Sequence, residues 1–318
     1  MLAKRIFALL TALLILSAGF TAVDARKTIE EYFAEMVIPD ITEASVTTPR
    51  MAVYDLESGA CLYGKGNADL TAPASLTKLV TAMVVLKNLP VYETVTVGSE
   101  LDLVEYDSSR CGIKEGQTYS VYGLLYGLLM RSGNDAAYTL AVNTARAVCE
   151  TKLNDREAAE YFCGMMNDLC RDIGAANSNF ATPDGYDATG QLTTLDDLAI
   201  IAKKALEYEI IAEITSCPLI EVYTTENEKN VWRNTNFFLN TAFPLYNPNV
   251  RGMKTGSTDD AGKCLITLFT SGGREFIAIV SGCTTEGERY ASASYLMAQV
   301  DVLSGMAEVV PVLLGAAG

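Results

Sequence analysis

The sequence contains no histidine in its 318 residues. This absence excludes Ser-His-Asp and Cys-His catalytic groups and most zinc hydrolase sites, which use histidine as a base or a ligand. The cysteines form no C-x-x-C pair, so redox and zinc sites of that spacing are excluded as well. A nucleophilic enzyme with this composition needs a base of another residue type.

Basic residues are also scarce, because 24 lysines and arginines stand against 39 acidic residues, a net charge of −15. This balance argues against nucleic acid or an anionic membrane surface as the main partner. The sequence has no internal repeat or low-complexity tract, which predicts a globular domain. Its 8 cysteines fit one or two disulfides as well as buried free thiols, so the sequence leaves their state open.

The N-terminus has the pattern of an export signal. Lys4 and Arg5 precede an uncharged run from Ile6 to Val23, and Val23-Asp24-Ala25 has the small residues of a cleavage site. We expect a signal peptide over residues 1–25 and a short amphipathic lead-in over 26–50. The uncharged run also reaches the roughly 18 residues of a minimal membrane span, so an uncleaved anchor is the alternative.

The distribution of strand and helix patterns predicts a mixed fold. Alternation predicts two short strands around the Glu57-Ser58-Gly59 turn, and the segment between Val91 and Pro218 is mainly helical. Two further strands, "GKCLITLFT" and "REFIAIVSG", flank a glycine turn, and a last helix is expected from Tyr290 to about Leu303. Strands at both ends of the chain predict one sheet built from distant segments, with a helical lobe beside it.

The stretch "PASLTKLVTAMVVL" carries one charge, Lys78, on an otherwise apolar helical pattern. Ser75 precedes it by three residues, so both side chains lie on the same side of a helix. An exposed lysine that reaches water is the ordinary explanation. Two later motifs favour a functional one: Ser132-Gly133-Asn134 at a predicted helix break, and Lys254-Thr255-Gly256 before the strand pair.

These three motifs, in this order, form the signature of serine acyl-transfer enzymes that react with penicillins, with Gly133 where aspartate is usual. A serine hydroxyl needs a neighbouring base, and a lysine serves when desolvation and nearby positive charge lower its pKa. Lys78 meets the first condition on its apolar helix, and we expect Lys254 to supply the second cation. Ser75, behind Pro73, would also lie at the favourable end of the helix dipole.

The chain resembles the D-alanyl-D-alanine carboxypeptidases, the low-molecular-mass penicillin-binding proteins. The three motifs carry the resemblance, together with "DLESGACLYGKGN" and "PDGYDATGQLTTLDDLAII" between them. It implies an α/β fold of the β-lactamase and D,D-peptidase type, with a central antiparallel sheet, flanking helices and a helical lobe. It also implies a catalytic domain over residues 51–305, followed by a short apolar tail over 306–318.

The resemblance implies roles for individual residues. Ser75 would be the acylated nucleophile and Lys78 its general base. Ser132 would relay protons towards the leaving amine, and Asn134 would hold Lys78 and the substrate amide. The backbone N–H groups of Ser75 and Ser257 would form the oxyanion hole.

The substrate-binding residues would lie on one strand and the helix after it. Lys254, Thr255 and Gly256 would form the strand that docks the peptide in extended form. Lys254 and the hydroxyls of Thr255 and Ser257 are candidates for binding the substrate's terminal carboxylate. Arg289, close to where the family places a carboxylate-binding arginine, would hold it bidentately.

These residues predict an exported D,D-carboxypeptidase that removes the terminal D-Ala from peptidoglycan stem peptides, without metal or cofactor. β-Lactam antibiotics would be covalent inhibitors, and the protein would act in the cell wall or at the outer face of a bacterial cytoplasmic membrane. The chain ends about thirty residues after Arg289, which leaves no room for the β-rich domain of many relatives.

Two alternatives remain at this stage. A β-lactamase shares the fold and the nucleophile, but one large class uses a glutamate to activate the deacylating water. We expect no E-x-x-L-N segment between Ser132 and Lys254, which disfavours this alternative. The other is a non-catalytic module that binds penicillin or peptidoglycan, which the complete set of catalytic residue types disfavours.

Overall fold

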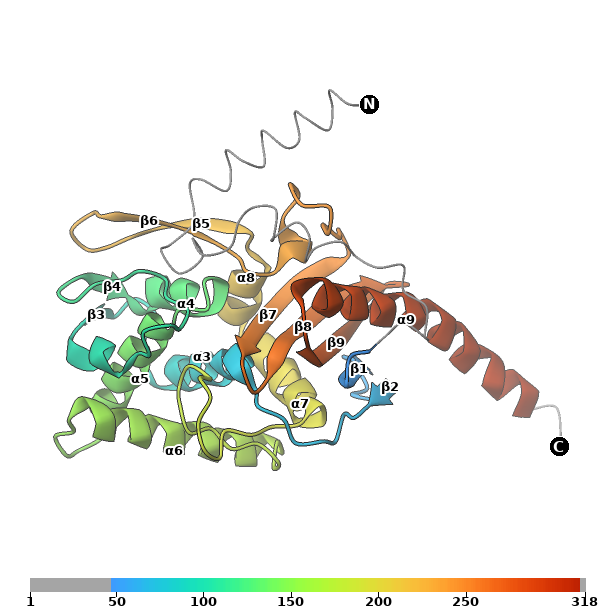
Figure 1. Cartoon of the computed structure of the whole chain (residues 1–318), viewed down its shortest axis with the longest axis horizontal. Helices are drawn as coiled ribbons and strands as arrows, with labels where there is room; N and C mark the ends of the chain where they lie inside the picture. Colours follow the sequence, from blue (N-terminus) through green and yellow to red (C-terminus); the bar gives the residue numbers. More distant parts are fainter. Residues whose placement is uncertain (1–46, 315–318) are drawn as a thin grey trace, which may run out of the picture.

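A five-stranded antiparallel sheet forms one half of the molecule (Figure 1). The structure, a computed structural model, describes residues 47–314. The strand order is β2-β1-β9-β8-β7, so strands from the two ends of the chain pair side by side. The strands are β1 (Arg50–Asp55), β2 (Cys61–Lys65), β7 (Val250–Thr258), β8 (Gly262–Ser271) and β9 (Arg274–Cys283). The predicted sheet of distant segments is therefore confirmed.

Alternating residues of the central strands cover the two faces of the sheet, as the two-residue period of a strand requires. On β8, Ile266 and Leu268 belong to the core shared with the helical lobe. Leu265 and Phe269, one residue out of phase, pack in a second core with residues of the last helix. Both faces are buried, which explains the nearly continuous apolar sequences of β8 and β9.

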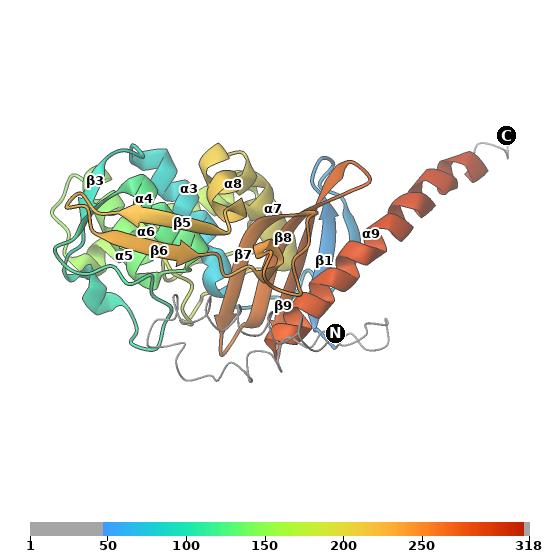
Figure 2. The ribbon, with the colours of Figure 1, turned by 90° about the horizontal axis from the view of Figure 1, so that it is seen from above.

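The last helix, α9, extends from Glu286 to Leu314 and crosses the second face of the sheet (Figure 2). The predicted range, Tyr290 to about Leu303, was too short at both ends. The helix begins earlier because Thr285 caps it, with its hydroxyl accepting from the backbone N–H of Glu288 at 3.1 Å. The first turn of α9 therefore lies beside β7 and β8. Sequence periodicity alone did not predict this turn.

The helical lobe lies beside the β7 edge of the sheet (Figure 1). It confirms the predicted helical region, including the break at Ser132-Gly133-Asn134 between α4 and α5. Its helices are α3 (Lys78–Asn88), α4 (Val121–Met130), α5 (Asn134–Val148), α6 (Asp155–Ile173), α7 (Leu195–Leu206) and α8 (Glu209–Ser216). Short 3-10 helices are η3 (Ala74–Thr77), η4 (Ser99–Leu103) and η5 (Phe237–Leu239).

Two small hairpins were not predicted. The first joins β3 (Thr94–Thr96) to β4 (Thr118–Ser120), and the second joins β5 (Leu219–Tyr223) to β6 (Lys229–Arg233). Only Val222 and Trp232 are buried on the two strands of the second hairpin, so its apolar pattern is too sparse to predict a strand pair. The hairpin is held to the lobe by Trp232, whose indole N–H donates to the carbonyl of Cys111 at 3.0 Å.

All eight cysteines are free thiols, which decides the question that the sequence left open. No helix within residues 47–314 is long and apolar enough to span a membrane. The predicted signal peptide and nearly all of the lead-in lie outside the described residues.

Candidate active site

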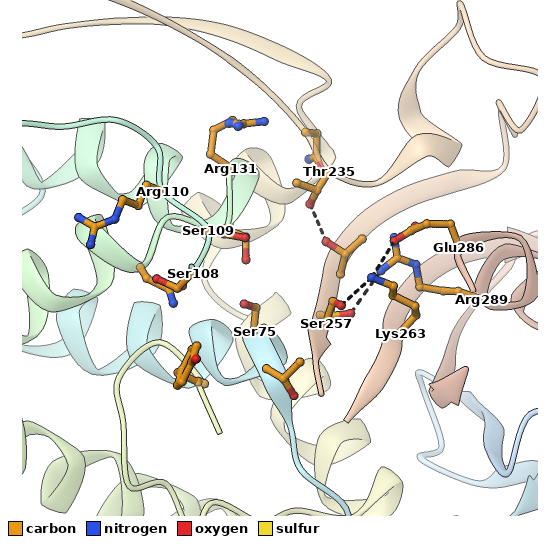
Figure 3. Close-up of a pocket in the computed structure, with 18 of the residues that line it drawn as sticks. Ser75, Ser108, Ser109, Arg110, Arg131, Thr235, Ser257, Lys263, Glu286 and Arg289 are labelled. Atoms are coloured by element: carbon orange, nitrogen blue, oxygen red, sulfur yellow. Dashed lines mark hydrogen bonds and ion pairs between the residues drawn. The ribbon is translucent and has the colours of Figure 1, made fainter. Parts of the chain in front are cut away.

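A cleft of about 470 Å³ lies between the helical lobe and β7 (Figure 3). Ser75, Ser132 and Asn134 line it from the helix side, and Thr255 and Ser257 line it from the strand side. The structure thus brings together the three sequence motifs, which lie far apart in the chain. Lys78 and Lys254 are fully buried behind the two walls of this cleft.

Ser75 lies on the short 3-10 helix η3, which leads directly into α3. Two glycines allow other segments to approach this turn closely. A Cβ atom on Gly256 of β7 would lie 3.3 Å from the backbone nitrogen of Ser75, and one on Gly185 would lie 1.9 Å from the carbonyl oxygen of Ala74. Gly185 also has a positive φ of 85°. Glycine is therefore required at position 185 for the Pro183-Asp184-Gly185 loop to reach the turn.

The Lys78 amine joins three segments of the helix side. Its Nζ lies 2.8 Å from Ser75 Oγ, 2.7 Å from Asn134 Oδ1 and 2.6 Å from the carbonyl oxygen of Asp184. The side chain does not snorkel to water, because it is fully buried. The ordinary explanation for a lone lysine on an apolar helix therefore does not apply here.

These three partners suit the ammonium form, which donates to all three oxygens, and they also suit the neutral amine. A neutral lysine amine has two N–H groups and one lone pair, whereas the ammonium form has three N–H groups. Asn134 Oδ1 and the Asp184 carbonyl only accept hydrogen bonds, whereas the Ser75 hydroxyl can also donate one. In its neutral state Lys78 thus donates to both carbonyl oxygens and presents its lone pair to the proton of Ser75.

Burial lowers the pKa of Lys78 to about 8, against the opposing effects of Asp184, Asp135 and Cys111. Burial, followed by repulsion from Lys78 and Arg289, lowers the pKa of Lys254 well below its usual range. The sequence-based expectation assigned part of the lowering at Lys78 to Lys254. In the structure, burial is the largest cause of the lowered pKa at both lysines, and Lys78 is among the cations that lower the pKa of Lys254.

The Ser132-Gly133-Asn134 turn is tightly held at the break between α4 and α5. Ser132 has a φ of 58°, a left-handed conformation that is uncommon for residues other than glycine. The Gly133 N–H donates to the carbonyl of Gly127 at 3.0 Å, and the Asn134 N–H donates to that of Ser109 at 2.8 Å. These bonds fix the side chains of Ser132 and Asn134 at the cleft.

The strand side presents the Lys254-Thr255-Gly256 motif on β7. The Lys254 amine donates to the carbonyl of Thr255 at 2.9 Å, and the Thr255 hydroxyl lies 2.6 Å from that of Thr235. Ser257 faces the cleft and accepts a hydrogen bond from Lys263 Nζ at 2.9 Å. This wall therefore combines hydroxyl groups with buried and half-buried cations.

Arg289, in the first turns of α9, also lines the cleft; both Nη atoms of its guanidinium have partners, whereas among the described residues its buried Nε has none. It forms an ion pair with Glu286, and its Nη1 donates to the carbonyls of Gly256 at 3.2 Å and Cys264 at 3.4 Å. Only 5% of the side chain is exposed. A bidentate grip on a ligand carboxylate would require displacement of Glu286.

Sequence reasoning missed four residues that shape the site. The backbone carbonyl of Asp184 contacts Lys78, and Lys263 and Glu286 line the strand side. Asp135 is buried behind the Ser132 turn, where it accepts from the backbone N–H groups of Cys111 at 2.9 Å and Gly112 at 2.8 Å. The Pro183-Asp184-Gly185 turn signal was the only available indication for the first of these.

One sequence pattern was overlooked: the segment from Glu150 to Asn154 matches E-x-x-L-N. The structure places it in the connection between α5 and α6, where Glu150 is exposed and Asn154 caps α6. Neither residue lines the cleft. Within the described part of the chain, no cluster of histidine, cysteine, aspartate and glutamate could hold a metal ion.

Comparisons with known proteins agree with this geometry. The chain is similar to DacC of Escherichia coli, a D-alanyl-D-alanine carboxypeptidase, with 33% identity over 80% of this chain and 61% of the relative. DacF of Bacillus subtilis, with the same description, is 30% identical over 77% of this chain and 60% of the relative. The Streptomyces K15 DD-transpeptidase superposes with a TM-score of 0.72 and 28% identity, covering 81% of this chain and 98% of that structure.

The chain spans about three fifths of the length of DacF and DacC. The family model described as D-alanyl-D-alanine carboxypeptidase matches residues 39–285, which include both walls of the cleft up to the end of β9. The chain therefore belongs to the D-alanyl-D-alanine carboxypeptidase family.

Proposed function

We propose that this protein is a serine-type D-alanyl-D-alanine carboxypeptidase that acts through a Ser75 acyl-enzyme with Lys78 as general base. The observation that carries the proposal is the buried Lys78 amine, 2.8 Å from Ser75 Oγ and with a pKa of about 8. A base with a pKa near the working pH is the most effective proton acceptor. Membership of the family supports the substrate class.

Acylation follows from the contacts on the helix side. Ser75 Oγ attacks the carbonyl carbon of the penultimate D-Ala while Lys78 Nζ takes the hydroxyl proton. The oxyanion is stabilised by the backbone N–H groups of Ser75 and Ser257. Ser132 then passes its proton to the nitrogen of the terminal D-Ala and takes up the proton held by Lys78. The C–N bond breaks, Lys78 is neutral again, and the peptide remains as an ester on Ser75.

Deacylation uses water as the second acceptor. Lys78 Nζ accepts a proton from this water while the water oxygen attacks the ester carbonyl. Lys78 then returns that proton to Ser75 Oγ as the bond to the peptide breaks. Asn134 keeps the amine oriented through both steps. The reaction needs no cofactor, and β-lactam antibiotics would acylate Ser75 by the same route.

The strand side binds the substrate. Lys254, Thr255 and Gly256 on β7 dock the stem peptide in extended form, and Ser257 and Arg289 belong to the region that receives its terminal carboxylate. The residues from 51 to 305 would form the catalytic domain. Export by the segment at residues 1–25 would place the enzyme where peptidoglycan lies, and if that segment is not cleaved it would anchor the enzyme to a membrane.

The test is release of D-Ala from a synthetic stem peptide that ends in D-Ala-D-Ala. Mass spectrometry of the reaction with the full chain should show loss of one alanine, whereas Ser75→Ala should release none. A peptide ending in L-Ala-L-Ala is the matched control and should remain intact. Equal release by wild type and Ser75→Ala would contradict the proposal.

A further inference from the structure

We propose that Tyr186 and Asp107 form the subsite for the residue that precedes D-Ala-D-Ala in the stem peptide, and that they select a side chain ending in a free amine, such as that of lysine. This inference deepens the proposed function and rests on it. Both residues line the cleft, and neither belongs to the three sequence motifs. They come from two loops that meet at the cleft.

The catalytic residues determine the direction in which the peptide crosses the cleft. Under the proposed function, the terminal carboxylate lies near Ser257 and Arg289, and the attacked carbonyl lies at Ser75. An extended peptide advances by about 3.3–3.6 Å per residue, so the preceding residue lies beyond Ser75. Figure 3 shows Ser108 there, across the cleft from Ser257 and Arg289. Asp107, the neighbour of Ser108 in the chain, therefore lies at the end of the cleft that this residue reaches.

The loop through Gly185 brings Tyr186 to the same end of the cleft. Gly185 packs closely against the turn that carries Ser75. The backbone N–H of Tyr186 donates to Asp184 Oδ1 at 3.0 Å, which holds the loop in this conformation. The Tyr186 hydroxyl donates to Asp107 Oδ1, also at 3.0 Å. The ring and the carboxylate are thus in contact before a ligand binds.

Negative charges lie near the Tyr186 hydroxyl. The hydrogen bond to Asp107 is the largest of the effects that raise the pKa of Tyr186 to about 12, and the charges of Glu105 and Asp187 act in the same direction. Asp187 also lines the cleft, and its buried Oδ1 has no hydrogen-bond partner among the described residues. Three carboxylates near one aromatic ring favour a positively charged ligand.

Two arginines of the helix side line the cleft as well, but they are directed elsewhere. Arg110, the basic residue nearest to Asp107 in the chain, donates from Nη2 to the carbonyl of Val104 at 2.8 Å. Figure 3 shows the guanidinium groups of Arg110 and Arg131 pointing away from Ser75. The side chain of a peptide bound at Ser75 therefore meets the Tyr186–Asp107 contact from the open side of the cleft.

The pair offers two complementary contacts to an ammonium group. The face of the Tyr186 ring attracts a cation, and Asp107 Oδ2 accepts a charge-assisted hydrogen bond while Oδ1 accepts from Tyr186. An acetylated amine has nearly the same reach but no charge, so it loses both contacts. Asp107 is exposed, and water weakens the interaction. We therefore expect about a threefold to tenfold preference for the free amine.

The experiment compares two tripeptides as substrates of the full chain. One is Nα-acetyl-Lys-D-Ala-D-Ala with a free side-chain amine, and the other has that amine acetylated. The quantity measured is the ratio of their kcat/KM values for release of D-Ala. The variants are Asp107→Asn, Tyr186→Leu and Tyr186→Phe. The matched control is Asp102→Asn, which changes an exposed carboxylate on η4 that does not line the cleft.

We expect the wild type and Asp102→Asn to prefer the free amine by about threefold to tenfold. The ratio should fall to about one in Asp107→Asn and in Tyr186→Leu, whereas Tyr186→Phe, which keeps the ring, should retain part of the preference. Circular dichroism verifies that each variant folds. A preference that survives in either Asp107→Asn or Tyr186→Leu would overturn the inference.

The wild type separates failure of this inference from failure of the proposed function. Equal hydrolysis of the two peptides would overturn the inference and leave the carboxypeptidase activity in place. Faster hydrolysis of the acetylated peptide would do the same. Release of D-Ala from neither peptide would overturn both the proposed function and the inference that rests on it.

Discussion

Each wall of the cleft buries one lysine, but the two amines have different hydrogen-bonding surroundings. Lys78, on the helix side, has three close oxygen partners, namely Ser75 Oγ, Asn134 Oδ1 and the Asp184 carbonyl. Among the residues that the structure describes, Lys254, on the strand side, donates to one acceptor, the carbonyl of Thr255. Both are fully buried. The helix side therefore surrounds its amine with hydrogen-bonding partners, whereas the strand side provides its amine with few.

Under the proposed function, the strand side binds the anionic end of the substrate. Lys254 is repelled by Lys78 and Arg289, and within the described residues Glu286 is the carboxylate that pairs with the cations of this wall. An incoming carboxylate relieves this excess of positive charge. Under the proposed function, the chemistry takes place at the helix wall and the substrate is recognised at the strand wall.

The largest expected effect is that of Lys78→Arg on the helix side. Arginine keeps the positive charge but cannot be deprotonated in a protein, so the base is lost. We expect the rate of acylation by benzylpenicillin to fall by about 10²–10⁴-fold. The rate is measured by quenching the reaction at a series of times and determining the acylated fraction from the intact mass of the protein. If Lys78→Arg is acylated at the wild-type rate, Lys78 is not the base, and the proposed difference between the two walls is wrong.

The pH dependence of acylation tests whether Lys78 is the base on the helix side. The neutral form of Lys78 is the base, and its fraction rises with pH through a pKa of about 8. At pH 6 the acylation rate should therefore be about a hundredfold below its plateau above pH 9. The measurement is the acylation rate of benzylpenicillin from pH 5.5 to 9.5, with circular dichroism as the control for folding. A rate that is constant between pH 6 and pH 9 would contradict this assignment.

The smallest effect concerns stability and compares the two lysines directly. In Lys78→Met three oxygen atoms lose contact with the amine, so we expect the free energy of unfolding to fall by about 1–3 kcal/mol. In Lys254→Met a buried amine crowded by other cations is removed, so we expect a rise of about 1 kcal/mol. Urea unfolding at pH 7 measures both. If both substitutions change the free energy of unfolding in the same direction, the two lysines contribute to stability in the same way, which would contradict this comparison.

The sequence predicted the parts of the fold that short-range patterns determine. Alternation and turn glycines located β1, β2, β8 and β9, and the Ser132-Gly133-Asn134 break separated α4 from α5. The start of α9 was missed because a single capping residue, Thr285, decides it. The β5–β6 hairpin was missed because it buries little, and its position depends on a contact between Trp232 and the distant Cys111 carbonyl.

The same distinction applies to the site. The structure brings Ser75, Lys78 and Asn134 together, as their motifs suggest. The contact with Asp184 is made by a backbone carbonyl, which every residue type possesses, so side-chain identity gives no signal for it. Lys263 resembles any solvated lysine at the start of a strand until the β7–β8 register places it opposite Ser257.

The most direct test of the acyl-enzyme account is the intact mass of the full chain after brief mixing with benzylpenicillin. We predict an adduct with the mass of the whole drug on the wild type and none on Ser75→Ala. An equal adduct on both proteins would contradict Ser75 as the nucleophile. If no adduct forms and the drug is hydrolysed, a β-lactamase would be favoured instead. If no adduct forms and the drug stays intact, a non-catalytic module would be favoured.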